Sequence, residues 1–350
     1  TRGAMLRITC VLLAAAATAA SAIGPGTVAE IHDIVELLQH KVTLDEVVKV
    51  KASHQHTGAV HAHRVEDDII TIFPGAAPRE DLRQIAVGPE VAGPPDPTND
   101  VAARCCPGDT AGTWFYNVTV PQLYAFYADP SSPNFKDAAV LVFPGGGFDF
   151  LAWNKEGTDI AAWLQSMGIS AFVLKYRVPE GQAVSLVDAQ RAVSLVRSRA
   201  SELSINASRI GVIGFSAGGG LVGSITGTPS RQYAPIDEID EFGFEPDFAL
   251  YIYGSGSPQH ALRAPPSFLA STTDDPCVSQ ESVTQFFEAL QAAGRKGELH
   301  VYEDGGHGYG RCTMYTMTGR ADTVCQWTVD AARWIDAVVF GTYPPLPQNG

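Results

Sequence analysis

The sequence is poor in positive charge. Its 350 residues include 24 Lys and Arg against 38 Asp and Glu, which gives a formal net charge of −14 with neutral histidines. Proteins that bind nucleic acid or an anionic membrane need clustered cations, so this balance argues against both partners. The chain also lacks an evident internal repeat, because its 34 Gly and 23 Pro separate elements rather than recurring at a fixed period.

The apolar segment near the N-terminus is short for a membrane span. It runs from Ile8 to Ala20, whereas a spanning helix needs ~20 apolar residues. Met5 and Arg7 precede it, and Ala20-Ser21-Ala22 is a small-x-small cleavage site. The pattern predicts a signal peptide over residues 1–22, and therefore a secreted, extracellular protein without a stable membrane anchor.

The rest of the chain divides into two patterns. Residues 23–111 are an N-terminal extension of unknown role, with a helix expected over Val28–Lys51 and a Pro-, Gly- and acid-rich linker over Gly75–Asp109. From Trp114 onward, apolar strands alternate with amphipathic helices. That alternation predicts an α/β fold whose mostly parallel, doubly wound sheet carries helices on both faces.

The predicted catalytic domain covers residues 112–341, and residues 342–350 form a tail. Strands are expected over Asn117–Tyr127, Ala138–Phe143, Ser170–Tyr176, Arg209–Gly214, Asp247–Tyr253, Ser267–Thr273 and Glu298–Tyr302. Helices are expected over Thr158–Ser166, Leu186–Ser204, Ala217–Thr226, Gln280–Ala293 and Val324–Phe340. The acidic, turn-rich segment Thr228–Pro246 is too short for a large cap, so a minimal cap and an open cleft are expected.

The most informative segment is Arg209–Gly220. The apolar run Ile210–Ile213 leads into Gly214-Phe215-Ser216-Ala217-Gly218, which is a G-x-S-x-G pattern. A nucleophilic serine needs an exposed Oγ and a nearby backbone N–H, and a sharp strand-to-helix turn supplies both. Glycines two residues before and after the serine relieve crowding in that turn. Ser216 is therefore the predicted nucleophile of a serine hydrolase.

His307 is the predicted general base. A serine hydroxyl is a weak nucleophile until a base takes its proton. His307 follows the last expected strand within Gly305-Gly306-His307-Gly308-Tyr309-Gly310, where glycines let a loop turn the imidazole toward the serine. His260 and His300 fit less well, because one lies in a Ser/Pro-rich loop and the other within a strand.

The partner of the histidine is expected directly after the strand Ser267–Thr273. Asp274 and Asp275 stand there, at the carboxyl end of a strand, where α/β sites assemble. Pro276 biases Asp275 toward extended backbone, so Asp275 is the preferred acid. Asp274 remains the alternative, either as the acid or as an acceptor for N–H groups in the turn.

The oxyanion of a tetrahedral intermediate needs convergent N–H donors. Ala217 offers one at the start of its helix. Gly146 and Gly147 are the expected others, because Pro144-Gly145-Gly146-Gly147-Phe148 follows a buried strand and its glycines allow close backbone approach.

These motifs belong to a longer ordered series between Trp114 and Trp334. The further members are Lys155-Glu156-Gly157, Phe172–Arg177, Asp188–Ala192 and Pro265–Leu269. The series resembles the secreted acetylxylan esterase-like branch of the α/β-hydrolases, which is similar to feruloyl-esterase-like and dienelactone-hydrolase-like proteins. The resemblance implies Ser216, Asp275 and His307 as the triad, and Gly146, Gly147 and Ala217 as the oxyanion hole.

This chain departs from that branch at two positions. Ser279 stands where the family carries proline, and Gly220 stands where it often carries histidine. Both departures concern substrate preference rather than the type of reaction.

The resulting hypothesis is a secreted carboxylic ester hydrolase that removes acetyl groups from polysaccharide. Its partner is a small-molecule or polysaccharide ester, its chemistry needs no cofactor or metal, and its oligomeric state is left open. One alternative is a peptidase of the prolyl-oligopeptidase type, and another is a non-catalytic binding module on the same fold.

Disulfides and glycosylation are expected in a secreted protein. Five cysteines remain beyond the signal peptide: Cys105, Cys106, Cys277, Cys312 and Cys325. A Cys312–Cys325 or a Cys277–Cys312 bridge would stiffen the rim of the site, and the odd number leaves at least one thiol free or intermolecular. Asn117 and Asn206 begin glycosylation sequons.

Other features have simpler interpretations. His54, His56, His61 and His63 would approach one another in a hairpin, but we interpret them as a polar segment and predict no metal site. Trp114, Trp163, Trp327 and Trp334 are expected in the core. Trp153 either packs there too or contacts substrate. The acidic run Asp237–Glu241 is expected to be a solvated loop.

Overall fold

The computed structural model describes residues 69–82, 87–106, 109, 111–179, 181–312 and 323–342. Several predicted features lie outside these residues. They are the signal peptide, the helix expected over Val28–Lys51, the histidines His54, His56, His61 and His63, and nearly all of the C-terminal tail. Among the helices that the structure describes, none is both long and apolar enough to cross a bilayer.

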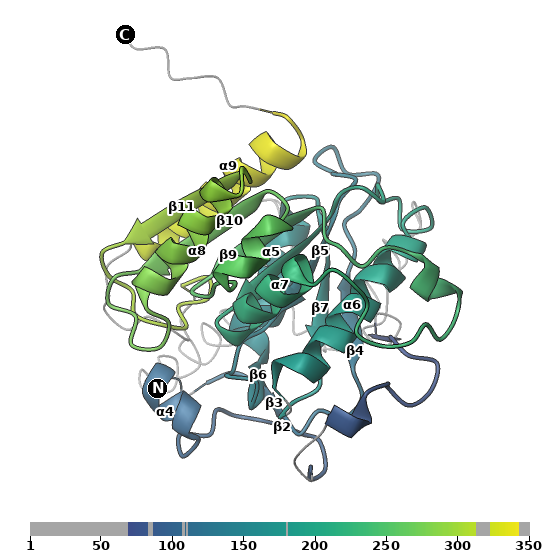
Figure 1. Ribbon diagram of the computed structural model, residues 1–350, viewed down its shortest axis with the longest axis horizontal. Coiled ribbons are helices and arrows are strands. Elements are labelled where there is room, and N and C mark those ends of the chain that lie inside the picture. The colour runs from purple at the N-terminus through teal and green to yellow at the C-terminus, as the bar shows by residue number, and fades with distance from the viewer. Residues whose placement is uncertain are drawn as a thin grey trace, which may run out of the picture. The chain divides into compact units, whose positions relative to one another are not determined.

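A large sheet of eight strands lies at the centre of the described part of the chain (Figure 1). Its strands, in spatial order, are β1 (Ile69–Thr71), β4 (Gln122–Phe126), β7 (Ser170–Lys175), β5 (Ala139–Phe143), β8 (Ile210–Phe215), β9 (Phe248–Ile252), β10 (Ser267–Thr272) and β11 (Gly297–Tyr302). From β7 to β11 all neighbours are parallel, whereas β1 and β4 are antiparallel at one edge. The mostly parallel sheet expected from the sequence is confirmed.

Helices cover both faces of this sheet and create two hydrophobic cores. On one face pack α6 (Gln182–Ser198), α7 (Ala217–Gly227) and α8 (Gln280–Ala292), and on the other pack α5 (Asp159–Ser166) and α9 (Trp327–Val339). Successive side chains of a strand point to opposite faces. In β5, Leu141 therefore belongs to the first core and Val142 to the second, and both are fully buried.

The expected linker Gly75–Asp109 and the residues just before it contribute to the same compact unit. Strand β1 pairs with β4, and Ile72 and Phe73, which follow it, are 1% and 3% exposed. Further along are β2 (Val91–Gly93) and the short helix α4 (Asp100–Cys105). Elements of three to six residues, set among Pro and Gly, are too short for a periodicity to show.

The strand expected over Asn117–Tyr127 is shorter than predicted, and the residues just before it belong to a second, small sheet. It consists of β2, β3 (Trp114–Tyr116) and β6 (Phe150–Ala152), all antiparallel. Asn117 has a φ of 54°, which no strand residue adopts, so β3 ends before it and β4 starts only at Gln122. The Trp114 and Phe150 rings stack at 4.0 Å between centroids.

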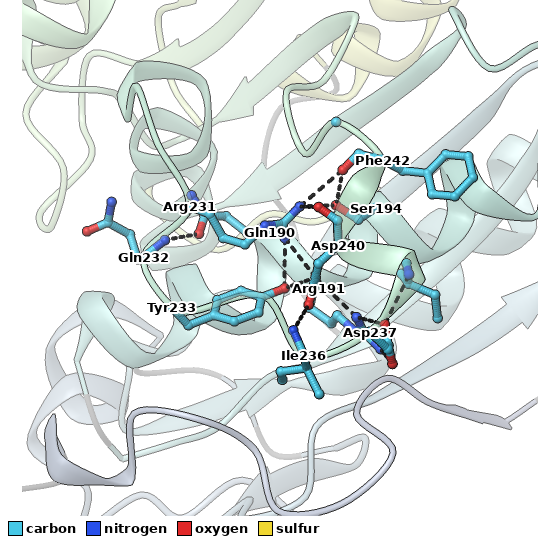
Figure 2. Close-up of polar contacts among 12 residues, drawn as sticks. Gln190, Arg191, Ser194, Arg231, Gln232, Tyr233, Ile236, Asp237, Asp240 and Phe242 are labelled. Carbon is cyan, nitrogen blue, oxygen red and sulfur yellow. Dashed lines mark hydrogen bonds and ion pairs between the residues drawn. The ribbon is translucent and has the colours of Figure 1, made fainter.

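The acidic run Asp237–Glu241 is not the solvated loop that we expected. Asp240 is only 9% exposed, and its carboxylate accepts the Tyr233 hydroxyl at 2.6 Å and the Ile236 N–H at 2.9 Å. Arg191 of α6 forms ion pairs with Asp237 and Asp240, as Figure 2 shows. Arg231 also pairs with Asp240. The sequence prediction failed because Arg191, which binds both aspartates, is about fifty residues away along the chain.

A buried ion pair joins the end of β7 to α6. Arg177 and Asp188 both have fully buried side chains, and their atoms Nη2 and Oδ1 are 2.7 Å apart. The Arg177 backbone N–H also donates to Asp188 Oδ2 at 3.0 Å. A buried charge that loses its partner is costly, so the pair fixes how the strand and helix meet.

We expect Asp188→Ala to lower the free energy of unfolding by about 3 kcal/mol, because it removes the buried carboxylate that pairs with Arg177 and leaves the guanidinium only the partly exposed carboxylate of Glu80. Urea unfolding followed by far-UV circular dichroism measures the loss. Glu202→Ala is the matched control, since Glu202 pairs with Arg199 on the surface, and its unfolding midpoint should stay almost unchanged. Equal effects of the two variants would contradict the assignment.

Candidate active site

Ser216 lies at the sharp turn between β8 and α7. Its φ is 52° and its ψ is −118°, a strained conformation for a residue with a side chain. The turn requires glycine on both sides, because a Cβ on Gly214 would collide with the carbonyl oxygen of Gly218, and a Cβ on Gly218 would collide with that of Phe143. The Ser216 N–H donates to the Ile252 carbonyl at 3.1 Å. Only the G-x-S-x-G residue pattern fits this geometry.

His307 lies beside the serine. Its Nε2 is 2.8 Å from Ser216 Oγ, and its side chain is only 2% exposed. The loop that carries it follows β11, and Gly305, Gly306 and Gly308 all have positive φ there. His300, the weaker candidate, instead lies with its Nε2 2.7 Å from Glu298 Oε1.

The two neighbouring aspartates occupy different positions. The Asp275 side chain is fully buried, its Oδ2 is 2.8 Å from His307 Nδ1, and its Oδ1 accepts the N–H groups of Cys277 and Val278. Asp274 accepts the N–H groups of Gly306 at 2.7 Å and Gly305 at 3.4 Å. One carboxylate thus contacts the imidazole, and the other holds the backbone of the loop that presents it.

Ser279, one of the departures from the family pattern, has a structural role. It is the N-cap of α8, and its hydroxyl accepts the Ser282 N–H at 3.3 Å. A serine there satisfies a helix N–H that proline would leave open. The substitution is therefore explained by the helix that follows the aspartate loop.

The glycine-rich loop after β5 lies against the serine. A Cβ on Gly145 would come within 2.8 Å of the Ser216 Cβ. The Gly145 N–H already donates to Glu156 Oε2 at 2.7 Å, while Gly146 and Gly147 have φ values of +133° and +65°. The Tyr176 hydroxyl donates to the Pro144 carbonyl at 2.6 Å and fixes the start of the loop. Ala217 is the first residue of α7, where N–H groups lack acceptors within the helix.

Helix α4 connects the glycine loop with the aspartate loop. Val101 lies against Gly147, where a Cβ would come within 2.8 Å of its side chain. Cys105, at the end of the same helix, forms a disulfide with Cys277, two residues after Asp275. This contact could not be predicted from the sequence, because a helix of six residues shows no clear periodicity and its partners lie far away along the chain.

The cysteines therefore pair only partly as expected. The Cys312–Cys325 bridge is present, whereas the alternative Cys277–Cys312 bridge is wrong, because Cys277 pairs with Cys105 across 172 residues. Cys106 is the free thiol among the described cysteines. Burial raises the pKa of the Cys106 thiol to about 11, so it stays protonated at neutral pH.

The tryptophans pack rather than form a sugar platform. Trp153 is 6% exposed and meets the rings of Phe115 and Tyr124 edge-on at 4.9 and 4.7 Å. The other four, Trp114, Trp163, Trp327 and Trp334, are buried as expected. Within the described ranges, no group of three or more His, Cys, Asp or Glu side chains is arranged to hold a metal ion.

Known sequences similar to this chain include an acetylxylan esterase and a xylanase. The family model described as BD-FAE matches residues 128–245. An acetylxylan esterase of Xylanibacter ruminicola is 31% identical over an alignment of 210 residues. The alignment covers 53% of this chain and 43% of that protein. Endo-1,4-beta-xylanase B of Butyrivibrio fibrisolvens is 27% identical over 223 residues, covering 54% of this chain and 34% of that protein. The chain thus spans less than half the length of these curated relatives.

Solved structures share the fold over a larger part of the chain. The acetyl ester-xyloside bifunctional hydrolase of Caldicellulosiruptor lactoaceticus has a TM-score of 0.56 and 28% identity, covering 78% of this chain and 96% of that one. MGS-M1, an α/β hydrolase from a deep-sea metagenome library, has a TM-score of 0.52 and 27% identity, covering 63% and 93%. A Thermogutta terrifontis esterase, at 23% identity and a TM-score of 0.54 over 65% of this chain and 92% of that one, shares the fold. The chain is an α/β-hydrolase, and within that superfamily it resembles the acetylxylan esterases.

Proposed function

We propose that this chain hydrolyses carboxylic esters with a triad of Ser216, His307 and Asp275, and that its substrates are O-acetyl groups on polysaccharide. The observation that carries the proposal is a continuous chain of hydrogen bonds. It runs from Ser216 Oγ to His307 Nε2 and from His307 Nδ1 to Asp275 Oδ2, each at 2.8 Å. A nucleophile, a base and an orienting carboxylate in this order are what acyl transfer through a serine needs.

Each residue has a definite task in this mechanism. Ser216 Oγ attacks the ester carbonyl while His307 Nε2 takes the hydroxyl proton, and Asp275 stabilises the imidazolium that results. The N–H groups of Gly146, Gly147 and Ala217 bind the oxyanion. When the tetrahedral intermediate collapses, the alcohol leaves with the proton from His307.

The second half of the reaction releases the acid. Water gives its proton to His307 Nε2 and attacks the acyl carbon, and a second tetrahedral intermediate forms in the same N–H environment. Its collapse frees the carboxylic acid and returns the proton to Ser216. Atoms and charge balance without a cofactor.

The acetyl preference is supported by the relatives rather than by the pocket. One relative is named for acetylxylan and a structural neighbour for acetyl esters and xylosides.

Export is part of the proposal. The Cys105–Cys277 and Cys312–Cys325 bridges support it, because disulfides persist in oxidising compartments.

We expect Ser216→Ala to abolish turnover of p-nitrophenyl acetate, with a fall in kcat of about 10⁶-fold, because no other group can form the acyl-enzyme. Circular dichroism should show the folded protein, and a fluorophosphonate probe should label wild type but not the variant. Retained turnover would refute the nucleophile. Acetate release from acetylated xylan tests the substrate, and faster cleavage of aminoacyl amides than of acyl esters would favour a peptidase instead.

Replacing Asp274 or Asp275 by asparagine should lower kcat to very different extents. We expect Asp275→Asn to lower kcat about 10⁴-fold, because an amide cannot fix the required tautomer of His307 or stabilise its charged form. Asp274→Asn should lose at most about tenfold, since its carbonyl oxygen can still accept the Gly306 N–H. Steady-state kinetics with p-nitrophenyl acetate measure both, and the reverse order would make Asp274 the acid.

Glycosylation should distinguish the two sequons when the protein is secreted from a eukaryotic host. Asn206 is exposed in a turn, where its side chain accepts the Ser208 N–H at 2.9 Å. The Asn117 amide donates to the Pro89 carbonyl at 3.3 Å, next to the fully buried Val118. Asn206→Gln should remove the mass that a peptide:N-glycosidase releases, and Asn117→Gln should not. A glycan on Asn117 alone would contradict this prediction.

A further inference from the structure

A buried carboxylate lies between the two loops that flank Ser216. Glu156 belongs to a π-helical turn, Asn154–Thr158, which comes after β6, and it is only 2% exposed. Turns of this kind are uncommon and recur at functional sites. The mechanism above gives Glu156 no task, although burying a carboxylate is costly unless its oxygens are satisfied.

Each oxygen of the Glu156 carboxylate has its own partner. Oε2 accepts the Gly145 N–H at 2.7 Å, and Oε1 accepts the Tyr253 hydroxyl at 2.9 Å. Gly145 directly precedes the two proposed oxyanion donors of the glycine loop. A Cβ on Gly145 would lie 2.6 Å from Glu156 Oε2 and 2.8 Å from the Ser216 Cβ. The carboxylate therefore fixes the loop at the point where it passes the serine.

Tyr253 extends this connection to the histidine loop. It directly follows β9, its side chain is fully buried, and its hydroxyl accepts the Gly310 N–H at 3.2 Å. Its ring meets the His307 imidazole edge-on, with centroids 4.9 Å apart. Burial, together with the charge of Glu156, holds the pKa of Tyr253 well above its usual value, so the phenol keeps donating to the carboxylate.

The histidine loop also rests directly on this region. A Cβ on Gly308, the residue after His307, would lie 3.0 Å from Lys155 Nζ and 4.0 Å from Glu156 Oε1. Lys155 is 5% exposed and forms an ion pair with Asp109. The cation next to Glu156 in the chain offsets part of the cost of burying the carboxylate.

We propose that Glu156 is a positioning residue that holds the glycine loop and the histidine loop in register around Ser216, through the Gly145 N–H and the Tyr253 hydroxyl. The inference rests on the proposed function, because it assigns a role within that reaction. Glu156 touches none of the reacting atoms. Small displacements of oxyanion donors and of the base slow the chemical steps more than substrate binding.

Two variants test the connection from its two ends. Glu156→Gln keeps the shape of the side chain but has a single carbonyl oxygen, so it cannot accept from both partners. Tyr253→Phe keeps the ring against His307 and removes only the hydroxyl. It also keeps the proposal testable should Glu156→Gln fail to fold.

The chain offers matched controls. Asp240 is a buried carboxylate that also accepts a tyrosine hydroxyl and a backbone N–H, in the network of Figure 2. Tyr251 is a fully buried tyrosine of β9 whose hydroxyl is 3.1 Å from that of Thr226. Tyr251→Phe therefore reports the general cost of losing such a bond. Asp240→Asn also weakens the ion pairs of Asp240 with Arg191 and Arg231, so it gives the upper limit of that cost away from the site.

With p-nitrophenyl acetate, we expect Glu156→Gln and Tyr253→Phe to lower kcat about 10- to 100-fold, with KM within about threefold of wild type. The double variant should lose less than the product of the single effects, because both changes break one connection. The rate of fluorophosphonate labelling of Ser216 should fall in parallel. Tyr251→Phe should lower Tm about as much as Tyr253→Phe, and Asp240→Asn should lower it at least as much as Glu156→Gln. Both controls should keep kcat within about twofold of wild type.

Unchanged kcat in both test variants, or equal losses in the controls, would overturn the positioning role. A rise in KM alone would overturn it too, because it would place Glu156 in substrate binding. If wild type itself neither hydrolyses acyl esters nor reacts with the fluorophosphonate, the proposed function fails and this inference fails with it. If wild type is active and both test variants are fully active, this inference is overturned while the proposed function stands.

Discussion

The positive φ of Ser216 is the constraint on which the site depends. The residue can adopt this conformation only because Gly214 and Gly218 let the end of β8 and the start of α7 approach each other and β5 without a Cβ between them. Strain of this kind costs about 1–3 kcal/mol and persists only where the surroundings enforce it. Here the surroundings are two buried hydrophobic cores on either face of the sheet, which hold the strand and helix in place.

The parallel sheet then brings the other groups to the same edge. The glycine loop follows β5, Ser216 follows β8, the aspartates follow β10 and His307 follows β11. The spatial order β5-β8-β9-β10-β11 places these carboxyl ends side by side. The end of β9 lies in the middle of the group, which is why Tyr253 can contact both His307 and Glu156.

Contacts beneath and around the loops decide how precisely these groups meet. Asp274 holds the backbone of the histidine loop, Tyr176 holds Pro144, and the Cys105–Cys277 disulfide joins α4 to the aspartate loop. Glu156 accepts hydrogen bonds from the Gly145 N–H in the glycine loop and from the Tyr253 hydroxyl at the end of β9. The site is thus a set of loops that are each fixed at more than one point, as preorganised electrostatic catalysis requires.

Local patterns in the sequence determined the parts of this protein that local physics controls. The alternation of apolar strands and helices predicted the doubly wound sheet, and the glycines around Ser216 and His307 predicted the loops that carry them, because close backbone approach leaves few other residue types possible. The sequence favoured Asp275 as the partner of the imidazole but left Asp274 open, and the tertiary structure places Asp275 there. Tertiary structure alone decided that Cys277 pairs with Cys105 and that Arg191 binds the acidic run. It also decided that β1, which precedes the expected linker, and α4, which lies within it, belong to the same compact unit as the large sheet. These outcomes depend on contacts between residues far apart in the chain, and neither composition nor periodicity records which distant partners meet.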